Sequence, residues 1–206
     1  MKGVVFIGGN APKSSVSRKA VKNARIIVAA DAGLIAAEEA GLQPDWIMGD
    51  MDSLDTRGAM ARLHNYRCDR ILRYPMDKDY TDTELALSLL WDKGCDETII
   101  IGGGGGRIDH IFALHALFER EPCPNQWLTD KEDIFCLKEG VFSCEARGLV
   151  SVFPVGQGPW QAKSEGLKWP LDHVVWRRGF FGISNVADGL FSISVMYGKF
   201  LVVIVR

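Results

Sequence analysis

Short apolar runs alternate with helix-like segments along the first part of the chain, and this alternation restricts the fold more than any other feature. Apolar runs at residues 4–7, 26–30, 46–48 and 98–101 have the length of buried strands, and residues 70–74 form a further short strand. Segments 15–23, 34–40, 85–91 and 108–119 have helical character. Strands and helices that alternate in this way predict parallel βαβ units with right-handed crossovers.

The character of the sequence changes near residues 121–125, where two prolines stand in a polar stretch typical of a linker. Beyond it, segments rich in valine, phenylalanine and serine are separated by glycines at intervals of roughly 8–12 residues, which favours an all-β sandwich or barrel. We therefore expect two domains of the α/β plus all-β class. A Rossmann-like domain with a parallel sheet spans residues 1–122, and a β-sandwich or barrel domain spans residues 123–206.

The composition excludes several classes of function. The 206 residues carry a formal net charge of −2 and no basic block, so the electrostatic signature of a nucleic-acid binder is missing. None of the five cysteines has C-x-x-C spacing, which predicts neither a zinc site nor a redox pair, and free thiols are typical of a reducing compartment. The apolar runs at 4–7 and 200–205 are too short for a signal peptide or a membrane span. We expect a cytoplasmic protein without nucleic-acid or membrane partners.

Carboxylates follow the predicted third strand, in the loop Gly49-Asp50-Met51-Asp52-Ser53. The carboxyl ends of parallel strands meet in one crevice, where open α/β sheets bind ligands. If the backbone is extended here, the side chains of Asp50 and Asp52 point to the same side, and a divalent cation relieves the repulsion between them. Magnesium suits such a pair because it takes a few carboxylate oxygens together with water and phosphate. The alternative is that Asp52 or Ser53 caps the next helix.

The second charged loop contains Asp77, Lys78 and Asp79 and runs into Thr81-Asp82-Thr83-Glu84. Thr81 and Glu84 have the spacing of a capping box, which leaves Asp82 in the first turn, at a helix N-terminus that also suits an anion. The ammonium group of Lys78 is suited to a phosphate oxygen. The alternative for this stretch is a solvated charged loop.

The third loop consists of five glycines, residues 102–106, and leads into Arg107-Ile108-Asp109-His110. Neither the dinucleotide fingerprint nor the P-loop pattern fits its spacing. Bare backbone directly after a buried strand favours close approach to a ligand, with Arg107 and Asp109 at the start of the following helix, whereas the alternative is a flexible linker. Asp31 follows the second strand, and the sequence does not decide between a site residue and a structural cap there.

These motifs form an ordered series at residues 30–33, 49–53, 77–84 and 106–110, which continues with Glu165-Gly166-Leu167-Lys168-Trp169-Pro170-Leu171 and Gly182-Ile183-Ser184-Asn185. The series resembles that of the thiamine pyrophosphokinase family and covers nearly the whole chain. Two positions depart from the usual pattern: Ala32 replaces a glycine, and Met51 replaces a phenylalanine between the paired aspartates. Neither change removes an ionisable group.

The resemblance implies an enzyme that transfers the terminal diphosphoryl group of ATP to the hydroxyl of thiamine, giving thiamine diphosphate and AMP. It also implies a homodimer, with thiamine bound where the two subunits meet. The implied site residues are Asp50, Asp52 and Asp82 for Mg²⁺; Asp31, Lys78, Thr81, Gly105, Gly106 and Arg107 for ATP; Asp82, Arg107 and Asp109 for catalysis; and Ser184 and Asn185 for thiamine. Asp82 and Asp109 are both candidates for the group that accepts the alcohol proton.

Two other functions share some of these features. A diphosphokinase for another hydroxymethyl heterocycle, such as a pterin, needs the same ATP loops and differs only in the pocket of the β domain. A non-catalytic nucleotide or thiamine sensor has no need for the full set of charged residues, so the presence of Asp50, Asp52, Asp82, Arg107 and Asp109 argues against it.

Overall fold

The computed structural model describes residues 1–56 and 58–206. The chain forms two compact units. The first contains Met1–Phe112 and Trp127–Asp130, and the second contains Ala113–Gln126 and Lys131–Arg206. The chain therefore passes from the first unit to the second, returns for a short strand and leaves again. The predicted boundary between residues 122 and 123 stays a prediction.

The first unit is built on parallel strands, as the alternation in the sequence predicts. These are β1 (Lys2–Phe6), β2 (Ile26–Ala30), β3 (Trp46–Gly49), β4 (Ile71–Arg73) and β5 (Glu97–Ile101). They pair in the order β4-β3-β2-β1-β5, and β6 (Gln126–Leu128) follows β5. The strand order reverses between β1 and β5, and such switch points are where open α/β sheets place ligand crevices.

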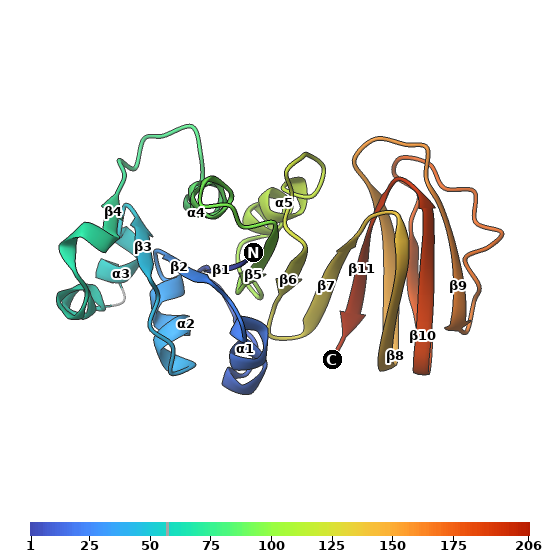
Figure 1. The fold of residues 1–206 in the computed structure, drawn as a ribbon, viewed down its shortest axis with the longest axis horizontal. Helices are drawn as coiled ribbons and strands as arrows, with labels where there is room; N and C mark the ends of the chain where they lie inside the picture. The colour runs from blue at the N-terminus through green and yellow to red at the C-terminus, as the bar shows by residue number, and fades with distance from the viewer. Residues whose placement is uncertain (57) are drawn as a thin grey trace. The chain divides into compact units, whose positions relative to one another are not determined.

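Helices connect these strands: α1 (Ser14–Val21), α2 (Gly33–Glu39), α3 (Asp52–Thr56), α4 (Asp82–Asp92) and α5 (Ile108–Ala116), with short 3₁₀ turns η1 (Met60–Asn65) and η2 (Cys68–Arg70). Figure 1 shows α1 and α2 on one side of the strands and α4 on the other, and both α2 and α4 pack against β1 and β2. The apolar runs of the strands are buried between these helices, which accounts for their nearly continuous apolar character, with Thr98 as a buried polar residue of β5.

Met51, the unusual residue between the paired aspartates, is part of the core of the first unit. It is 1 % exposed and packs with Leu34, Ile47 and Leu54. Methionine fills irregular apolar space well because its side chain is unbranched and flexible. The change from the family's phenylalanine is therefore a matter of packing.

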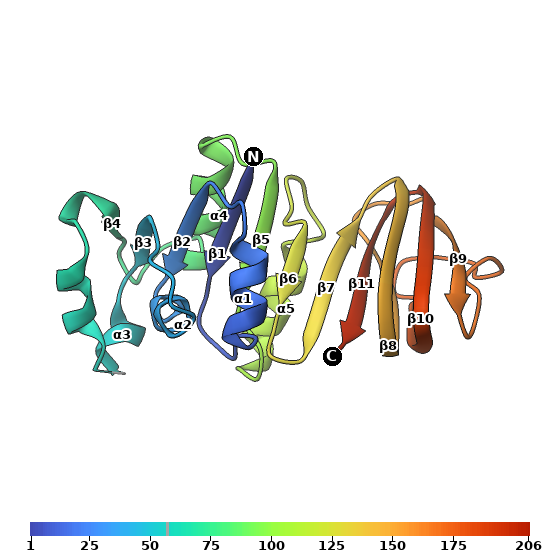
Figure 2. The same cartoon turned by 60° about the horizontal axis from the view of Figure 1, so that its bottom comes forward.

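The second unit consists of antiparallel strands in the order β7-β11-β8-β10-β9, which Figure 2 shows side by side. Their bounds are β7 (Glu132–Leu137), β8 (Gly140–Val155), β9 (Gln161–Leu167), β10 (Gly182–Tyr197) and β11 (Lys199–Val205). One core gathers Val150, Phe191, Ile193 and Phe200, and Trp176 from the loop between β9 and β10 covers it. Closure into a sandwich or barrel stays a prediction.

The sequence pattern is wrong about the strand lengths in the second unit. It treats the glycines as turns between short segments, but Gly148 and Gly189 lie inside β8 and β10, each of which has 16 residues. Gly166 lies in β9, where an added Cβ would lie 2.4 Å from the carbonyl oxygen of Leu190. Gly166 therefore allows the backbones of β9 and β10 to approach closely.

Neither unit contains a helix, among the described residues, that is long and apolar enough to cross a membrane. All five cysteines are free thiols.

Candidate active site

Two carboxyl groups lie beside one ammonium group in the first unit, and a third lies close to them. The Nζ atom of Lys78 lies 3.6 Å from Oδ2 of Asp50 and 3.3 Å from Oδ2 of Asp82. Lys78 also donates a hydrogen bond to the carbonyl oxygen of Pro75 at 2.9 Å, which ties the charged loop together. The Lys78, Asp50 and Asp82 side chains are only 14 to 16 % exposed, so these charges interact with little screening by solvent.

Asp31 is the third carboxyl group of this cluster. It follows β2 with φ of 46°, and its Oδ1 atom accepts a hydrogen bond from the backbone N–H of Met51 at 3.2 Å. Burial and the negative charges of Asp82 and Asp50 together raise the pKa of Asp31 to about 7, against the opposing hydrogen bond from Met51. The cluster thus carries more negative charge than Lys78 compensates. The structure places Asp31 near Asp50 and Asp82, and its role in ATP binding stays a prediction.

Asp82 is held in place by the start of α4. The hydroxyl of Thr81 accepts from the backbone N–H of Glu84 at 3.2 Å, and the Glu84 carboxylate accepts from the backbone N–H of Thr81 at 2.8 Å. The predicted capping box is confirmed, and it sets Asp82 in the first turn. The Oδ1 atom of Asp82 is buried and has no hydrogen-bond partner among the described residues. An unsatisfied carboxylate oxygen in such a place is suited to a cation.

The backbone between Asp50 and Asp52 is not that of an extended strand. Met51 between them has φ of 69°, so the backbone turns, and the expectation based on an extended chain is wrong. The Oδ1 atom of Asp50 accepts from the backbone N–H of Asp52 at 3.1 Å, while Oδ1 of Asp52 accepts from the Ser53 hydroxyl at 3.2 Å. Partial burial opposes ionisation of Asp50, but hydrogen bonding with Asp52 and the charge of Lys78 lower its pKa. Asp52 itself is exposed at the start of α3.

No three histidine, cysteine, aspartate or glutamate side chains within residues 1–56 and 58–206 are placed to hold a metal ion by themselves. Lys78 instead lies between Asp50 and Asp82. The predicted ligand set of Asp50, Asp52 and Asp82 stays a prediction.

The glycine loop after β5 has a structural role that the sequence did not reveal. Its backbone pairs with the loop after β1: the N–H of Gly103 donates to the carbonyl of Gly8 at 2.8 Å, and that of Asn10 donates to Gly104 at 2.6 Å. A Cβ at Gly102 would lie 2.4 Å from the carbonyl oxygen of Ile7. Close approach of two loops at the β1/β5 switch point therefore requires several of these glycines. Gly105 and Gly106 are exposed at the end of the loop.

Arg107 and Asp109 form an exposed, bidentate pair at the start of α5. Nε of Arg107 lies 3.1 Å from Oδ1 of Asp109, and Nη2 lies 2.5 Å from Oδ2. The guanidinium group lowers the pKa of Asp109, which makes this carboxylate a weaker base while the pair is intact. The fork geometry of the guanidinium also matches a phosphate group.

Ser184 and Asn185 lie at the start of β10 in the second unit. Asn185 is buried, and its amide group pairs with the backbone of Trp169: Oδ1 accepts from Trp169 N–H at 3.1 Å, and Nδ2 donates to the Trp169 carbonyl at 2.6 Å. Oδ1 also accepts from the backbone N–H of Val186 at 2.8 Å. Asn185 therefore holds Trp169, whose ring is 53 % exposed. Ser184 is exposed with φ of 60°, and its N–H donates to the Ser151 hydroxyl at 3.1 Å.

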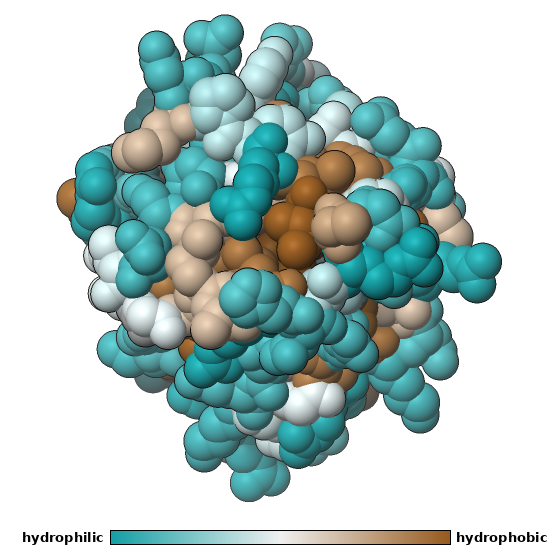
Figure 3. Space-filling view, turned by 90° about the vertical axis from the view of Figure 1, so that its left-hand side faces the viewer, coloured by the Kyte–Doolittle hydropathy of each residue, from teal (hydrophilic) through white to brown (hydrophobic). Residues whose placement is uncertain are grey.

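The first unit also contains a hollow that no sequence pattern predicts. It has a volume of about 510 Å³ and lies between η1 and β4, lined by Met60, Ala61, Leu63, His64, Tyr66, Cys68, Ile71 and Arg73. Figure 3 views the side on which β4 and α3 lie in Figure 1, and it shows a hydrophobic centre surrounded by hydrophilic surface. Its lining comes from 3₁₀ turns without regular periodicity, so no sequence pattern marks it.

Comparison with known proteins gives the family of this chain. The family model described as "Thiamin pyrophosphokinase, catalytic domain" matches residues 17–124, which include Asp31, Lys78 and the acidic and glycine loops. The chain belongs to the thiamin pyrophosphokinase family. Membership supports an enzyme that transfers a diphosphoryl group from ATP to thiamine, and it does not favour the pterin or sensor alternatives.

Individual relatives agree with this family. Thiamine pyrophosphokinase of Bacillus subtilis strain 168 is 28 % identical over 152 residues, which cover 71 % of this chain and 70 % of the relative. The solved structure of the B. subtilis protein has a TM-score of 0.79 at 20 % identity, with 100 % of this chain and 99 % of that chain covered. Thiamin pyrophosphokinase from Geobacillus thermodenitrificans has a TM-score of 0.76 at 22 % identity, with 100 % and 98 % covered. The fold of both units thus occurs in the family's solved structures.

Proposed function

We propose that this chain transfers the terminal diphosphoryl group of ATP to thiamine at the crevice formed by the carboxyl ends of β2 and β3 and the start of α4. The observation that carries the proposal is that Asp50 and Asp82 lie beside the ammonium group of Lys78, and that Asp31 interacts with both of these carboxylates. These residues are distant in the sequence, and packing alone gives no reason to gather three carboxyl groups in a partly buried place.

The donor set fits a magnesium ion. When ionised, the three carboxyl groups outnumber the single ammonium group, and Oδ1 of Asp82 lacks a hydrogen-bond partner among the described residues. Magnesium binds proteins through one or two carboxylates and completes its shell with water and substrate phosphates. Asp50 and Asp82 would hold the ion, with Asp52 as the third predicted ligand. When bound, magnesium neutralises polyphosphate charge and orders its oxygens.

The chain's own cationic and backbone groups bind the rest of the triphosphate. Lys78 offers a point charge, and the N-terminus of α4 beyond Thr81 favours an anion. The Arg107 guanidinium offers two parallel hydrogen bonds once it exchanges Asp109 for phosphate, and Gly105 and Gly106 offer exposed backbone beside it. Binding of this kind positions the phosphorus for in-line attack, which is most of what phosphoryl transfer needs from a protein.

The hydroxyl of thiamine loses a proton as it attacks the β-phosphorus, and AMP leaves. The proton acceptor in this proposal is Asp82 or Asp109. Asp109 becomes the stronger base only when Arg107 turns from it to the phosphates, because the guanidinium lowers its pKa. Asp82 needs no such change, but it would also hold magnesium, and a bound cation would weaken it as a base.

The second half of the chain is assigned to thiamine. Residues 1–122 form the Rossmann-like nucleotide domain of the proposal, and residues 123–206 form the sandwich-like thiamine domain, with Ser184 exposed and Asn185 fixing Trp169. The resemblance to the family supports a homodimer with thiamine between the subunits. The five free thiols support a cytoplasmic location.

Release of AMP from ATP tests the proposal, with thiamine and a hydroxymethylpterin as alternative acceptors. We expect AMP with thiamine and magnesium and none with the pterin. AMP with the pterin alone, or with neither acceptor, contradicts the proposed function.

A pair of substitutions tests the site. Asp82→Asn removes the charge and keeps the shape, and kcat should fall on the order of 10²-fold. Asp92→Asn, at the other end of α4, is the matched control, and the kcat of this variant should equal that of the unmodified protein. Asp52→Asn should likewise lower the chemical step much more than stability. Normal turnover of folded Asp82→Asn excludes this site.

A further inference from the structure

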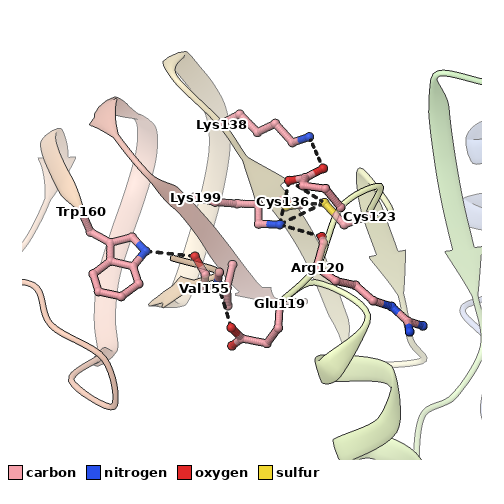
Figure 4. A network of polar contacts seen from close by, with 10 residues as sticks. Glu119, Arg120, Cys123, Cys136, Lys138, Val155, Trp160 and Lys199 are labelled. Carbon is pink, nitrogen blue, oxygen red and sulfur yellow. Dashed lines mark hydrogen bonds and ion pairs between the residues drawn. The ribbon is translucent and has the colours of Figure 1, made fainter. Parts of the chain in front are cut away.

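A cluster of two thiols and two ammonium groups lies in the second unit, away from the residues discussed above; Cys123 and Lys199 are buried in it, and Lys138 is exposed at its edge. Its members are Cys123 in the connection after α5, Cys136 in β7, Lys199 at the start of β11, Lys138 after β7, and Glu121. Figure 4 shows Lys199 at the centre of these contacts. Cys123 Sγ lies 3.8 Å from Cys136 Sγ, so the two sulfur atoms are in contact.

Lys199 is aimed at the sulfur of Cys123. Its Nζ atom lies 3.4 Å from that sulfur, 2.9 Å from Oε1 of Glu121 and 3.0 Å from the carbonyl oxygen of Arg120. The lysine side chain is 10 % exposed. The positive charge of a buried ammonium group needs a negative partner. Glu121 also forms an ion pair with Lys138, whose Nζ lies 2.9 Å from its Oε2 atom. Two ammonium groups share one carboxylate, and a thiolate at Cys123 balances the remaining charge.

The environment of Cys123 favours its thiolate. Hydrogen bonding from the Cys136 thiol, together with the charge of Lys199, lowers the pKa of Cys123 to about 7, although burial and Glu121, 3.8 Å away, oppose this. The same contact and burial raise the pKa of Cys136. The Arg120 guanidinium points away from the cluster in Figure 4, so Lys199 and Lys138 are the cations that face it. The thiolate is the nucleophile in thiol chemistry, so the two cysteines have different roles.

The backbone sets the two sulfurs in fixed register. The N–H of Cys136 donates to the carbonyl oxygen of Asn125 at 2.8 Å, which ties the Cys123 segment to β7. Cys123 is 7 % exposed, so a small oxidant reaches it more easily than a bulky one. The two thiols are in contact, and the ammonium group of Lys199 lies beside the sulfur of one of them. This arrangement is typical of a nucleophilic cysteine next to a resolving cysteine.

We propose that Cys123 and Cys136 form a peroxide-sensitive dithiol, in which Cys123 reacts first, Lys199 stabilises its thiolate, and Cys136 closes a disulfide. The Cys123 thiolate attacks one oxygen of a hydroperoxide, the O–O bond breaks, and the departing oxygen takes a proton from water. Cys136 then attacks the resulting sulfenic acid; an S–S bond forms, the S–O bond breaks, and hydroxide leaves as water with the Cys136 proton. The two sulfurs are oxidised as the peroxide is reduced, and an external dithiol reverses the change.

Peptide mapping after treatment with hydrogen peroxide tests the proposal. We expect a Cys123–Cys136 disulfide to appear before Cys68, the exposed cysteine, is oxidised, and to disappear with dithiothreitol. In Cys136→Ser, the sulfenic-acid probe dimedone should label Cys123, whereas in Cys123→Ser it should leave Cys136 unlabelled. Oxidation of Cys68 without the disulfide, or dimedone on Cys136, overturns the proposal.

The pH profile separates a reactive cluster from a merely structural one. The rate of disulfide formation should rise with pH around an inflection near 7. In Lys199→Gln the inflection should move towards about 8.5, the ordinary value for cysteine. Lys138→Gln removes a cation from the same glutamate but not from the sulfur, so it should move the inflection less and is the control. An unchanged inflection in folded Lys199→Gln contradicts the role of the lysine. If Lys199→Gln does not fold, dimedone labelling of Cys136→Ser still tests the reactivity of Cys123.

Discussion

Gly49 leaves the space that the carboxyl group of Asp31 occupies. A Cβ atom at position 49 would lie 1.8 Å from Oδ1 of Asp31, and Gly49 has φ of 139°. A side chain at position 49, at the end of β3, would collide with the acidic side chain of Asp31, which follows β2. Gly49 of one motif is therefore coupled to Asp31 of another, although the two residues are distant in the sequence.

Gly49→Ala should displace Asp31 and lower activity. A misplacement of about 1 Å in a catalytic site costs on the order of 10²-fold in rate, and we expect kcat to fall by this order. Gly41→Ala is the matched control, since Gly41 also has positive φ (72°) but no atom within 4 Å of an added Cβ. Both variants lose stability through backbone strain, so only Gly49→Ala should lose turnover beyond its loss of folded protein. Equal kcat in the two folded variants contradicts the link.

Lys78→Met should destabilise the protein and make it depend on magnesium. Without the ammonium group, Asp50 and Asp82 lose their counterion, and the free energy of unfolding should fall by about 3 kcal/mol. Magnesium should then raise the melting temperature more in the variant than in the unmodified protein, because a cation bound to the folded state stabilises it. Lys13→Met, which removes an exposed ammonium group of the same unit, should respond to magnesium as the unmodified protein does.

Much of the first unit follows from the sequence because its signals are local. Apolar runs predict all five parallel strands from β1 to β5, and the spacing of Thr81 and Glu84 predicts the start of α4 correctly. The approach of Asp50 to Asp82 also follows, since the carboxyl ends of neighbouring parallel strands and the start of a following helix meet at one edge, whereas the sequence left the role of Asp31 open.

Other features depend on backbone or tertiary geometry that no local pattern contains. The left-handed backbone at Met51 interrupts the extended chain between Asp50 and Asp52, and the position of Lys78 between two carboxylates depends on the path of a whole loop. The contact of Cys123 with Cys136 joins a connection to a strand, so a search for C-x-x-C spacing misses it. Gly148 and Gly189 resemble turn signals because the local sequence does not show that β8 and β10 continue past them as long paired strands.

Thr81→Ala should loosen the start of α4. The variant loses the hydroxyl that accepts from the Glu84 N–H, and the loss of such a cap costs about 1 kcal/mol. Activity should fall as well, since the first turn positions Asp82. Thr81→Ser keeps the hydroxyl and should restore both properties. Stability from urea unfolding and kcat are the two measurements; loss of both in Thr81→Ser shows that the methyl group, not the cap, is what matters.

Glu121→Gln should remove a pH-dependent part of the stability of the second unit. Burial opposes ionisation of Glu121, but its bonds with Lys199 and Lys138 lower its pKa below the ordinary 4.5. A carboxylate with a lowered folded-state pKa stabilises fully above its ordinary value and loses this effect as pH falls through the folded-state value. Because the side chain is 57 % exposed, we expect about 1 kcal/mol at neutral pH.

Urea unfolding as a function of pH measures the effect of Glu121. The difference between the unmodified protein and Glu121→Gln should be largest at neutral pH and shrink as the pH is lowered past 4.5. Glu139→Gln removes a carboxylate from the exposed turn between β7 and β8 and should leave the profile unchanged. A constant difference across this range means that Glu121 acts through its shape rather than its charge, which argues against the charge balance assigned to Lys199, Lys138 and Cys123.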